Sequence, residues 1–313
     1  MAIKIQSFGG RIGWTARKVV PRLASWAYTK AMFLLRRKAT MNYIDCFLNN
    51  DKPVLHPFLV SIETINRCNG TCAFCPCNIN DEKRPFKQMT EDLFHSIVEQ
   101  LISWNYKGRI VMNANNEPFM DTRIIEWTHY VRENLPASNI YLVTNGTLMT
   151  LEKFRKIAPF LNEININNYS DRMQLHENIR EIIGYVKGKT DEFHHLTIDI
   201  QYRYVNEVLS NRNGYAPNKS AKVAIHEPCL EPFTHMVILP DGVIAPCCFP
   251  LFAETNLGLG NCGENTLEEI WNSNEYYKIR ELLRKDRSKY SFCKYCDGFS
   301  KIIRTITPHE HTP

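Results

Sequence analysis

The chain has 313 residues, 44% of them hydrophobic, which is enough for one large core or two smaller ones. No run of 18 uncharged apolar residues occurs and the start does not resemble a secretory signal, so we expect a cytoplasmic protein. Nine Lys or Arg residues and no acidic residue precede Asp45, and the remainder has 38 − 9 = 29 basic against 33 acidic residues. The body is therefore not basic, which argues against nucleic acid as a partner.

The first region, residues 1–52, is a basic arm. Its segment 22–38, RLASWAYTKAMFLLRRK, combines aromatic and Leu residues with cations, which predicts an amphipathic helix. Such a helix suits the surface of an anionic bilayer, so we expect peripheral contact with the inner face of the membrane. The equal alternative is a helix that packs over the body with its charges solvated.

The second region, residues 53–225, alternates strand and helix patterns. Strands are predicted at 58–65, 109–113, 139–144, 163–167 and 196–202, with a weak sixth around 221–226. Helices are predicted at 90–104 (with Thr90 as N-cap), 122–133, 150–160 and 171–187. This alternation predicts an α/β fold of parallel strands with crossover helices, in an open sheet or a barrel.

The third region, residues 226–313, has a different pattern. HMVILPDGVIAPCC (235–248) predicts a β-hairpin around Pro-Asp-Gly. A helix is predicted to begin after Thr266, which is spaced with Glu269 as a capping box, and to continue to about Lys285. The region therefore predicts a small domain of a hairpin plus a helix.

Eleven cysteines are too many for a cytoplasmic protein without metal binding. The stretch CNGTCAFCPC places Cys68, Cys72 and Cys75 in a C-x3-C-x2-C array directly after the first predicted strand. Three thiolates on a [4Fe–4S] cluster leave one iron open for a small chelating molecule. Zinc is the alternative, and it would need a fourth ligand such as Cys77.

With Phe74 before its third cysteine, this array resembles the signature of the radical SAM superfamily. The resemblance implies a partial (β/α)6 TIM-like barrel and S-adenosylmethionine bound at the open iron. It also implies an oxidoreductase that generates a 5′-deoxyadenosyl radical to abstract hydrogen from its substrate. A flavodoxin- or ferredoxin-type protein is the implied electron donor.

Two segments extend the resemblance to the cofactor site. NANNEP (113–118) is similar to the family's Gly-Gly-Glu-Pro segment, with asparagines in place of the glycines, and TNG (144–146) matches a common family segment. Glu117 would then accept a hydrogen bond from the methionyl ammonium. The cofactor-binding residues implied by the resemblance are Phe74, Asn115, Asn116, Glu117 and Asn145.

The third region holds a second cysteine set, spaced C-x17-C and then C-x2-C, which consists of Cys229, Cys247, Cys293 and Cys296. With its Asp-Gly hairpin, Gly260-Asn261 and Glu-Ile-Trp (269–271), the region resembles the SPASM/twitch extension. No cysteine follows Cys296, so the resemblance implies the shorter twitch form with one auxiliary [4Fe–4S] cluster. A zinc ribbon is the alternative, and Cys248 is an alternative ligand to Cys247.

Two arginines are candidates for the site. Arg212 is predicted to contact the substrate hydroxyl as a catalytic group, and Arg203 to contact the cofactor, roles that a guanidinium suits. A structural or solvated arginine is the alternative for each. The remaining cysteines (Cys46, Cys77 and Cys262) are predicted to be buried small residues, and His226 and His235 to be satisfied away from metal.

The cysteine layout resembles that of an aminocyclitol dehydrogenase group within the twitch enzymes. The resemblance implies oxidation of a secondary alcohol in a sugar- or aminocyclitol-like molecule, with the auxiliary cluster as electron acceptor. Peptide or protein maturation of the RiPP or sulfatase type stays open. So does carbohydrate epimerisation, with Cys248 or Cys262 as the thiol. Glu117 and the alternation of strands and helices argue against an electron carrier or a structural zinc protein.

Overall fold

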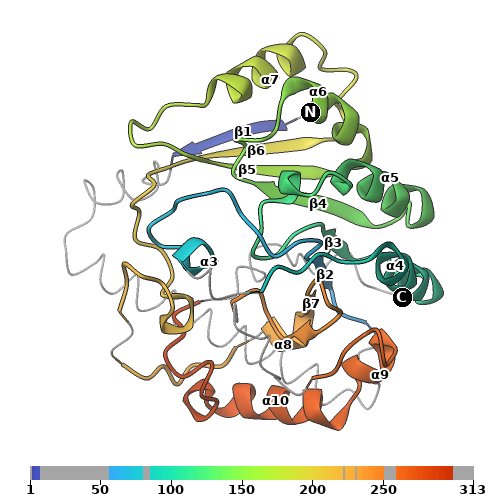
Figure 1. Ribbon diagram of the computed structural model, residues 1–313, viewed down its shortest axis with the longest axis vertical. Coiled ribbons are helices and arrows are strands. Elements are labelled where there is room, and N and C mark those ends of the chain that lie inside the picture. Colours follow the sequence, from blue (N-terminus) through green and yellow to red (C-terminus); the bar gives the residue numbers. More distant parts are fainter. Residues whose placement is uncertain are drawn as a thin grey trace, which may run out of the picture.

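The computed structural model describes the backbone of residues 2–7, and residues 56–79, 85–220, 223–229, 231–249 and 259–298. Its strands form one eight-stranded sheet in the order β1-β6-β5-β4-β3-β2-β7-β8 (Figure 1). The strands are β1 (Ala2–Ser7), β2 (Leu59–Ile62), β3 (Arg109–Val111), β4 (Asn139–Thr144), β5 (Glu163–Tyr169), β6 (Thr197–Arg203), β7 (His235–Ile238) and β8 (Ile244–Ala245). The helices are α3 (Pro76–Ile79), α4 (Glu91–Ser103), α5 (Ile124–Asn134), α6 (Leu151–Ile157), α7 (Glu177–Lys187), α8 (Glu231–Thr234), α9 (Leu267–Trp271) and α10 (Asn274–Lys285). Short 3-10 turns are η2 (Pro118–Met120), η3 (Ala158–Phe160), η4 (Arg212–Gly214) and η5 (Arg287–Lys289).

Strands β2 to β6 form the barrel part of the sheet. Each strand pairs in parallel with the next one along the chain. The crossovers contain α4, α5, α6 and α7, which lie along the outer face of the sheet in Figure 1. Parallel neighbours need such crossovers, because a tight hairpin joins only antiparallel strands. The predicted α/β fold with a parallel, partial TIM-like sheet is confirmed.

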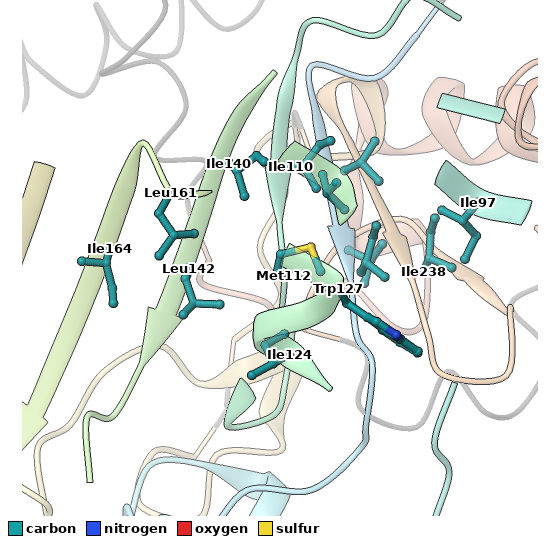
Figure 2. Close-up of a cluster of buried hydrophobic side chains, with 14 of the residues drawn as sticks. Ile97, Ile110, Met112, Ile124, Trp127, Ile140, Leu142, Leu161, Ile164 and Ile238 are labelled. Carbon is teal, nitrogen blue, oxygen red and sulfur yellow. The ribbon is translucent and has the colours of Figure 1, made fainter. Parts of the chain in front are cut away.

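The core lies between the sheet and these helices. Ile110 of β3 and Leu142 of β4 belong to this core, and Figure 2 shows Met112, directly after β3, beside Trp127 of α5. The Trp127 ring stacks on Phe94 of α4 with 4.0 Å between the ring centroids. Each fully buried side chain of this size contributes about 1.5–3 kcal/mol. Packing of this kind holds the carboxyl ends of the strands in place.

The opposite face of the barrel strands is polar. On β5 and β6, Asn165 Nδ2 donates to Asp199 Oδ2 at 3.1 Å, and Asn167 Nδ2 donates to Asn165 Oδ1 at 3.0 Å. Gln201 Nε2 also donates to Asp199 Oδ2, at 3.3 Å. Strand residues point alternately to opposite faces, so the same strands supply an apolar outer core and a polar interior.

The C-terminal region contains the predicted hairpin. β7 and β8 are antiparallel, and Gly242 N donates to Leu239 O at 2.9 Å across the turn. Gly242 has a φ of 83°, and a Cβ there would lie 2.4 Å from Asn261 Oδ1, so glycine is required. β7 also pairs in parallel with β2, which makes the hairpin a continuation of the barrel sheet.

Two predictions differ from the structure, and a third is not tested by it. Residues 2–7, assigned above to the basic arm, form β1, which pairs in parallel with β6. The weak sixth strand around 221–226 is wrong for residues 223–226, which are not in a strand. The amphipathic segment 22–38 lies outside the described residues. Within the described ranges, no helix has the length and apolar character needed to cross a membrane.

Candidate active site

The first cysteine array lies in the loop between β2 and α3, at the carboxyl end of the sheet. Cys75 N donates to Cys72 O at 3.0 Å, which turns the loop back on itself. A Cβ on Gly70 would lie 3.4 Å from Cys68 Sγ and 3.7 Å from Cys72 Sγ, so glycine leaves space between the two sulfurs. Glycine at this position therefore leaves room between two of the three thiols of the array.

The surroundings of the first array disfavour ionisation of the Cys72 thiol. Burial, followed by the neighbouring Cys75 and Cys68, raises the pKa of the Cys72 thiol to about 12. Clustered buried thiols resist ionisation by themselves, and metal binding removes their protons. Thiolates are the usual ligands of iron–sulfur clusters, so the donor set fits the predicted cluster.

Glu117 joins the end of β3 to the end of β4. It is 1% exposed, and its Oε1 accepts hydrogen bonds from Thr144 Oγ1 at 2.7 Å and Phe119 N at 3.2 Å. Its Oε2 accepts from Asn145 N at 2.8 Å. Burial raises the pKa of this carboxyl, and the hydrogen bonds oppose that shift. A carboxylate has about four acceptor positions, so one stays open on Oε2 for an ammonium group.

The asparagines beside Glu117 differ in what they bind. Asn116 Oδ1 accepts from Ala114 N at 3.1 Å, whereas its buried Nδ2 has no partner among the described residues. An unpaired buried donor costs about 1–3 kcal/mol, so this N–H group fits a site that a ligand completes. Asn145 Nδ2 donates to Asn69 Oδ1 at 2.9 Å in the cysteine loop.

Phe74 and Arg203 are buried and contact other protein side chains. Phe74 is buried, with its ring centroid 5.4 Å from that of Tyr169. Arg203 is 5% exposed and donates to Asn167 Oδ1, Glu207 Oε2 and Gln201 Oε1. These three acceptors favour the structural alternative for Arg203, and its contact with the cofactor stays a prediction.

Arg212 lies between the two cysteine sets. Its half-buried guanidinium donates to Asn115 Oδ1 at 3.1 Å and lies 5.2 Å from the centroid of the Phe249 ring. Burial lowers the pKa of Arg212, but Cys75 of the first array and Cys248 of the second region outweigh this and raise it. The structure thus brings together two segments that are far apart in the sequence.

The second cysteine set gathers beside α10 and η5. Burial raises the pKa of the Cys229 thiol to about 12 and that of Cys247 well above its ordinary value. Cys247 interacts electrostatically with Cys293 and Cys229, and Cys229 with Cys296, so the four predicted ligands are mutual neighbours. They form a second thiol set of the kind that binds iron–sulfur clusters.

Cys247 fits this set better than Cys248. The thiol of Cys248 has its pKa raised to about 11 by burial, opposed first by Arg212. Cys248 thus interacts electrostatically with Arg212, while Cys247 interacts with Cys248, Cys293 and Cys229. This difference favours Cys247 over Cys248 as the fourth ligand of the second set.

The remaining predicted bystanders are mostly as expected. Cys262 is buried in the hydrophobic core. His226 Nδ1 lies 3.0 Å from Asp286 Oδ1, and His235 bridges Ser61 Oγ at 2.8 Å and Glu231 Oε2 at 2.9 Å. Both histidines are satisfied by protein groups, as predicted, and Cys46 lies outside the described residues.

Sequence reasoning missed the position of Cys77. Its Sγ donates to Asn115 O at 3.1 Å, and its thiol faces Arg212. It was interpreted as a buried small residue, and it is buried, but beside the candidate site. Its position two residues after Cys75, at the start of α3, was the available indication.

Comparisons with known proteins fit this geometry. The Radical SAM superfamily profile matches residues 62–195, and the SPASM iron–sulfur cluster-binding domain profile matches residues 229–297. The S-adenosyl-L-methionine-dependent 2-deoxy-scyllo-inosamine dehydrogenase of Niallia circulans is 25% identical over 247 residues, covering 77% of this chain and 93% of that protein. The two profiles together imply S-adenosylmethionine, its [4Fe–4S] cluster and auxiliary iron–sulfur binding, as predicted.

Two solved structures show the same fold. BtrN in complex with AdoMet and 2-DOIA has a TM-score of 0.65 at 22% identity, covering 78% of this chain and 94% of that chain. Hexahistidine-tagged anSMEcpe with bound AdoMet has a TM-score of 0.51 at 14% identity, covering 77% of this chain and 86% of that chain. Sequence identities this low indicate a shared fold only, and they do not identify the substrate of this chain.

Proposed function

We propose that this chain, which matches the Radical SAM superfamily profile over residues 62–195 and the SPASM profile over residues 229–297, oxidises a secondary alcohol of an aminocyclitol or sugar-like molecule. When bound, the clusters and S-adenosylmethionine would supply a 5′-deoxyadenosyl radical to remove the carbinol hydrogen and an acceptor for the remaining electron, while the hydroxyl proton leaves to solvent. The relative from Niallia circulans is named for its action on 2-deoxy-scyllo-inosamine. That name supports an aminocyclitol as the substrate class.

The observation that carries the proposal is the position of Arg212. Its guanidinium donates to Asn115 Oδ1 at 3.1 Å and interacts electrostatically with Cys75 of the first array and Cys248 of the second region. A guanidinium donates hydrogen bonds but cannot accept a proton at neutral pH, so Arg212 would orient and polarise the hydroxyl oxygen. A substrate held there would lie between the two proposed cluster sites, as a two-electron oxidation requires.

Seven cysteines are the proposed cluster ligands. Cys68, Cys72 and Cys75 would hold the cluster that binds S-adenosylmethionine. The auxiliary cluster, of the one-cluster twitch type, would be held by Cys229, Cys247, Cys293 and Cys296. Support comes from the space between the sulfurs beside Gly70 and from the mutual electrostatic interaction of the second set.

The cofactor would be held by the ends of β3 and β4. Glu117 has an open acceptor position for the methionyl ammonium, and Asn116 has an unpaired buried Nδ2 among the described residues. Asn145 ties this segment to the cysteine loop through Asn69. We further propose a flavodoxin- or ferredoxin-type electron donor, and peripheral membrane contact through the arm of a cytoplasmic protein.

A turnover assay tests the proposal. The anaerobically reconstituted protein is incubated with dithionite, S-adenosylmethionine and 2-deoxy-scyllo-inosamine, and both products are quantified. We expect 5′-deoxyadenosine and the ketone in equal amounts. Oxidation of no aminocyclitol or sugar alcohol, with 5′-deoxyadenosine formed instead on addition of a peptide, would favour peptide modification.

Iron counting tests the proposed ligands. Two [4Fe–4S] clusters correspond to about eight irons per chain. Changing Cys68, Cys72 and Cys75 together to Ala should halve the iron content and abolish cleavage of S-adenosylmethionine, because only the first cluster is lost. Stoichiometric zinc in the anaerobically purified protein would contradict the auxiliary cluster.

Cys77 gives a specific reason to test epimerisation as a second candidate. A redox-neutral epimerase needs a thiol that returns hydrogen to the substrate, and the Cys77 thiol faces Arg212. Turnover in deuterium oxide separates the two reactions. Deuterium incorporated at the carbinol carbon, and lost in Cys77→Ser, would support epimerisation, whereas ketone without incorporation supports dehydrogenation.

A further inference from the structure

The segment that follows β6 is tied to the C-terminal cysteine pair by Asp297. Ser210 Oγ and Asn211 N both donate to Asp297 Oδ1, at 2.8 Å and 2.7 Å. Lys219 forms an ion pair with Asp297 Oδ2. Asp297 N donates back to Asn211 Oδ1 at 3.2 Å. One carboxylate thus holds both ends of the loop that contains Arg212.

The same loop also contacts a proposed cluster ligand. The backbone N–H of Asn213 donates to the sulfur of Cys296, as does Gly298 N at 3.4 Å. Asn211 Nδ2 donates to the carbonyl oxygen of Tyr295. The Arg212 loop and the Cys296 segment therefore form one hydrogen-bonded unit.

This loop has a conformation that its own residues do not favour. Arg212 and Asn213 have φ values of 49° and 63°, in the left-handed region. Asparagine tolerates this region, whereas an arginine is strained there and persists only where the surroundings impose it. Among the described residues, no partner reaches Oδ1 or Nδ2 of Asn213 either, so its side chain does not stabilise the turn. Backbone bonds from Gly214 N and Ala216 N to Asn211 O, at 2.8 Å and 3.0 Å, close the turn, and the bonds to Asp297 and Cys296 hold it in place from outside the loop.

We propose that Asp297 is a positioning residue that holds Arg212 in its substrate-facing conformation. The SPASM segment then has a second task besides cluster binding, because it builds one wall of the substrate site. The inference rests on the proposed function, in which Arg212 orients the hydroxyl of the substrate. It goes beyond that function by assigning the loop's conformation to a residue that touches neither substrate nor cluster iron.

Two substitutions at this position and one control form the test. Asp297→Ala removes every side-chain bond to the loop, whereas Asp297→Asn keeps a carbonyl oxygen for Ser210 and Asn211. The control is Asp286→Asn, because Asp286 is a carboxylate of the same region that binds His226 and Ser288 instead. Iron content and the electron paramagnetic resonance spectrum of the reduced auxiliary cluster are measured first.

We expect Asp297→Ala to keep both clusters, to lower kcat at least tenfold and to raise the Kd for 2-deoxy-scyllo-inosamine at least fivefold by equilibrium dialysis. Asp297→Asn should recover most of both values, and Asp286→Asn should match the wild type. If Asp297→Ala loses iron, Ser210→Ala decides the question, because it removes one bond of the network, leaves Asp297 in place and should raise the Kd. Wild-type Kd and kcat in every network variant that keeps both clusters, with Ser210→Ala among them, would overturn the proposal.

A double-mutant cycle with Arg212→Gln separates this inference from the proposed function. If Asp297 acts through Arg212, Asp297→Ala should have no further effect on the Kd in the Arg212→Gln protein. Full additivity of the two changes would overturn the positioning role. An Arg212→Gln protein with normal substrate binding and turnover would instead contradict the proposed role of Arg212 itself.

Discussion

Glu117 combines a structural task with a proposed ligand-binding task in one carboxylate. Its three hydrogen bonds come from Thr144 Oγ1, Asn145 N and Phe119 N, so it holds the ends of two strands together. Burial disfavours its charge, and these donors oppose that effect. The remaining acceptor position on Oε2 is the one proposed to bind the methionyl ammonium of S-adenosylmethionine.

We expect Glu117→Gln to weaken binding of S-adenosylmethionine. A hydrogen bond to a charged group contributes about 1.5–3 kcal/mol, which corresponds to a Kd roughly 10 to 100 times higher. Equilibrium dialysis with the anaerobically reconstituted protein measures the Kd. Thr144→Val is the control, because it removes one structural donor and leaves the charge in place, so its Kd should change less. An unchanged Kd in Glu117→Gln would contradict the assignment.

At the scale of single elements, side-chain caps mark the starts of α4, α6, α9 and α10. Thr266 and Glu269 form the predicted capping box of α9, with Glu269 N donating to Thr266 Oγ1 at 3.2 Å and Thr266 N to Glu269 Oε2 at 2.8 Å. Thr150 caps α6 with a single bond from Lys153 N at 3.2 Å. The box satisfies two backbone N–H groups at once, so α9 depends more on its cap.

Thr266→Ala should therefore lower stability more than Thr150→Ala. Loss of an N-cap costs about 1 kcal/mol, which corresponds to a decrease in Tm of about 2 °C in a chain of this size. Anaerobic thermal unfolding followed by circular dichroism measures the difference between the two variants. Equal Tm values for wild type and Thr266→Ala would show that packing of α9, not its cap, holds the helix.

At the scale of the whole molecule, the sheet is extended at both edges of the barrel. β1 pairs with β6 at one edge, and β7 pairs with β2 at the other (Figure 1). An open edge exposes unpaired backbone groups and invites association, so these strands protect the barrel. The first residues of the chain are therefore part of the fold, which changes how the arm should be tested.

The arm should be neutralised and not deleted, because deletion would also remove β1. Substituting Arg22, Arg36, Arg37 and Lys38 with Gln leaves the strand and removes charge from the predicted amphipathic segment. We expect the wild type to bind anionic vesicles more tightly than this variant, and added salt to weaken that binding. Sedimentation with vesicles measures the bound fraction, and equal partitioning of both proteins would show that the arm does not bind membranes.

Local patterns in the sequence were enough for the elements and the cysteine arrays. Strand alternation, the caps at Thr90 and Thr266 and the turn at Gly242 depend on near neighbours, so the sequence predicts them directly. The spacing of Cys68, Cys72 and Cys75 likewise indicated its chemistry without a structure. What these features share is that the interacting groups lie within a few residues of each other.

Only the tertiary structure determined the contacts between these elements. The pairing of β1 with β6, the position of Arg212 between the two cysteine sets and the hold of Asp297 on its loop each join segments far apart in the chain. The alternation of Ile3 and Ile5 with polar residues was visible, but its partner strand was not. The reason is physical: a short strand or a lone arginine has many compatible partners, and only the packing of the whole sheet selects one of them.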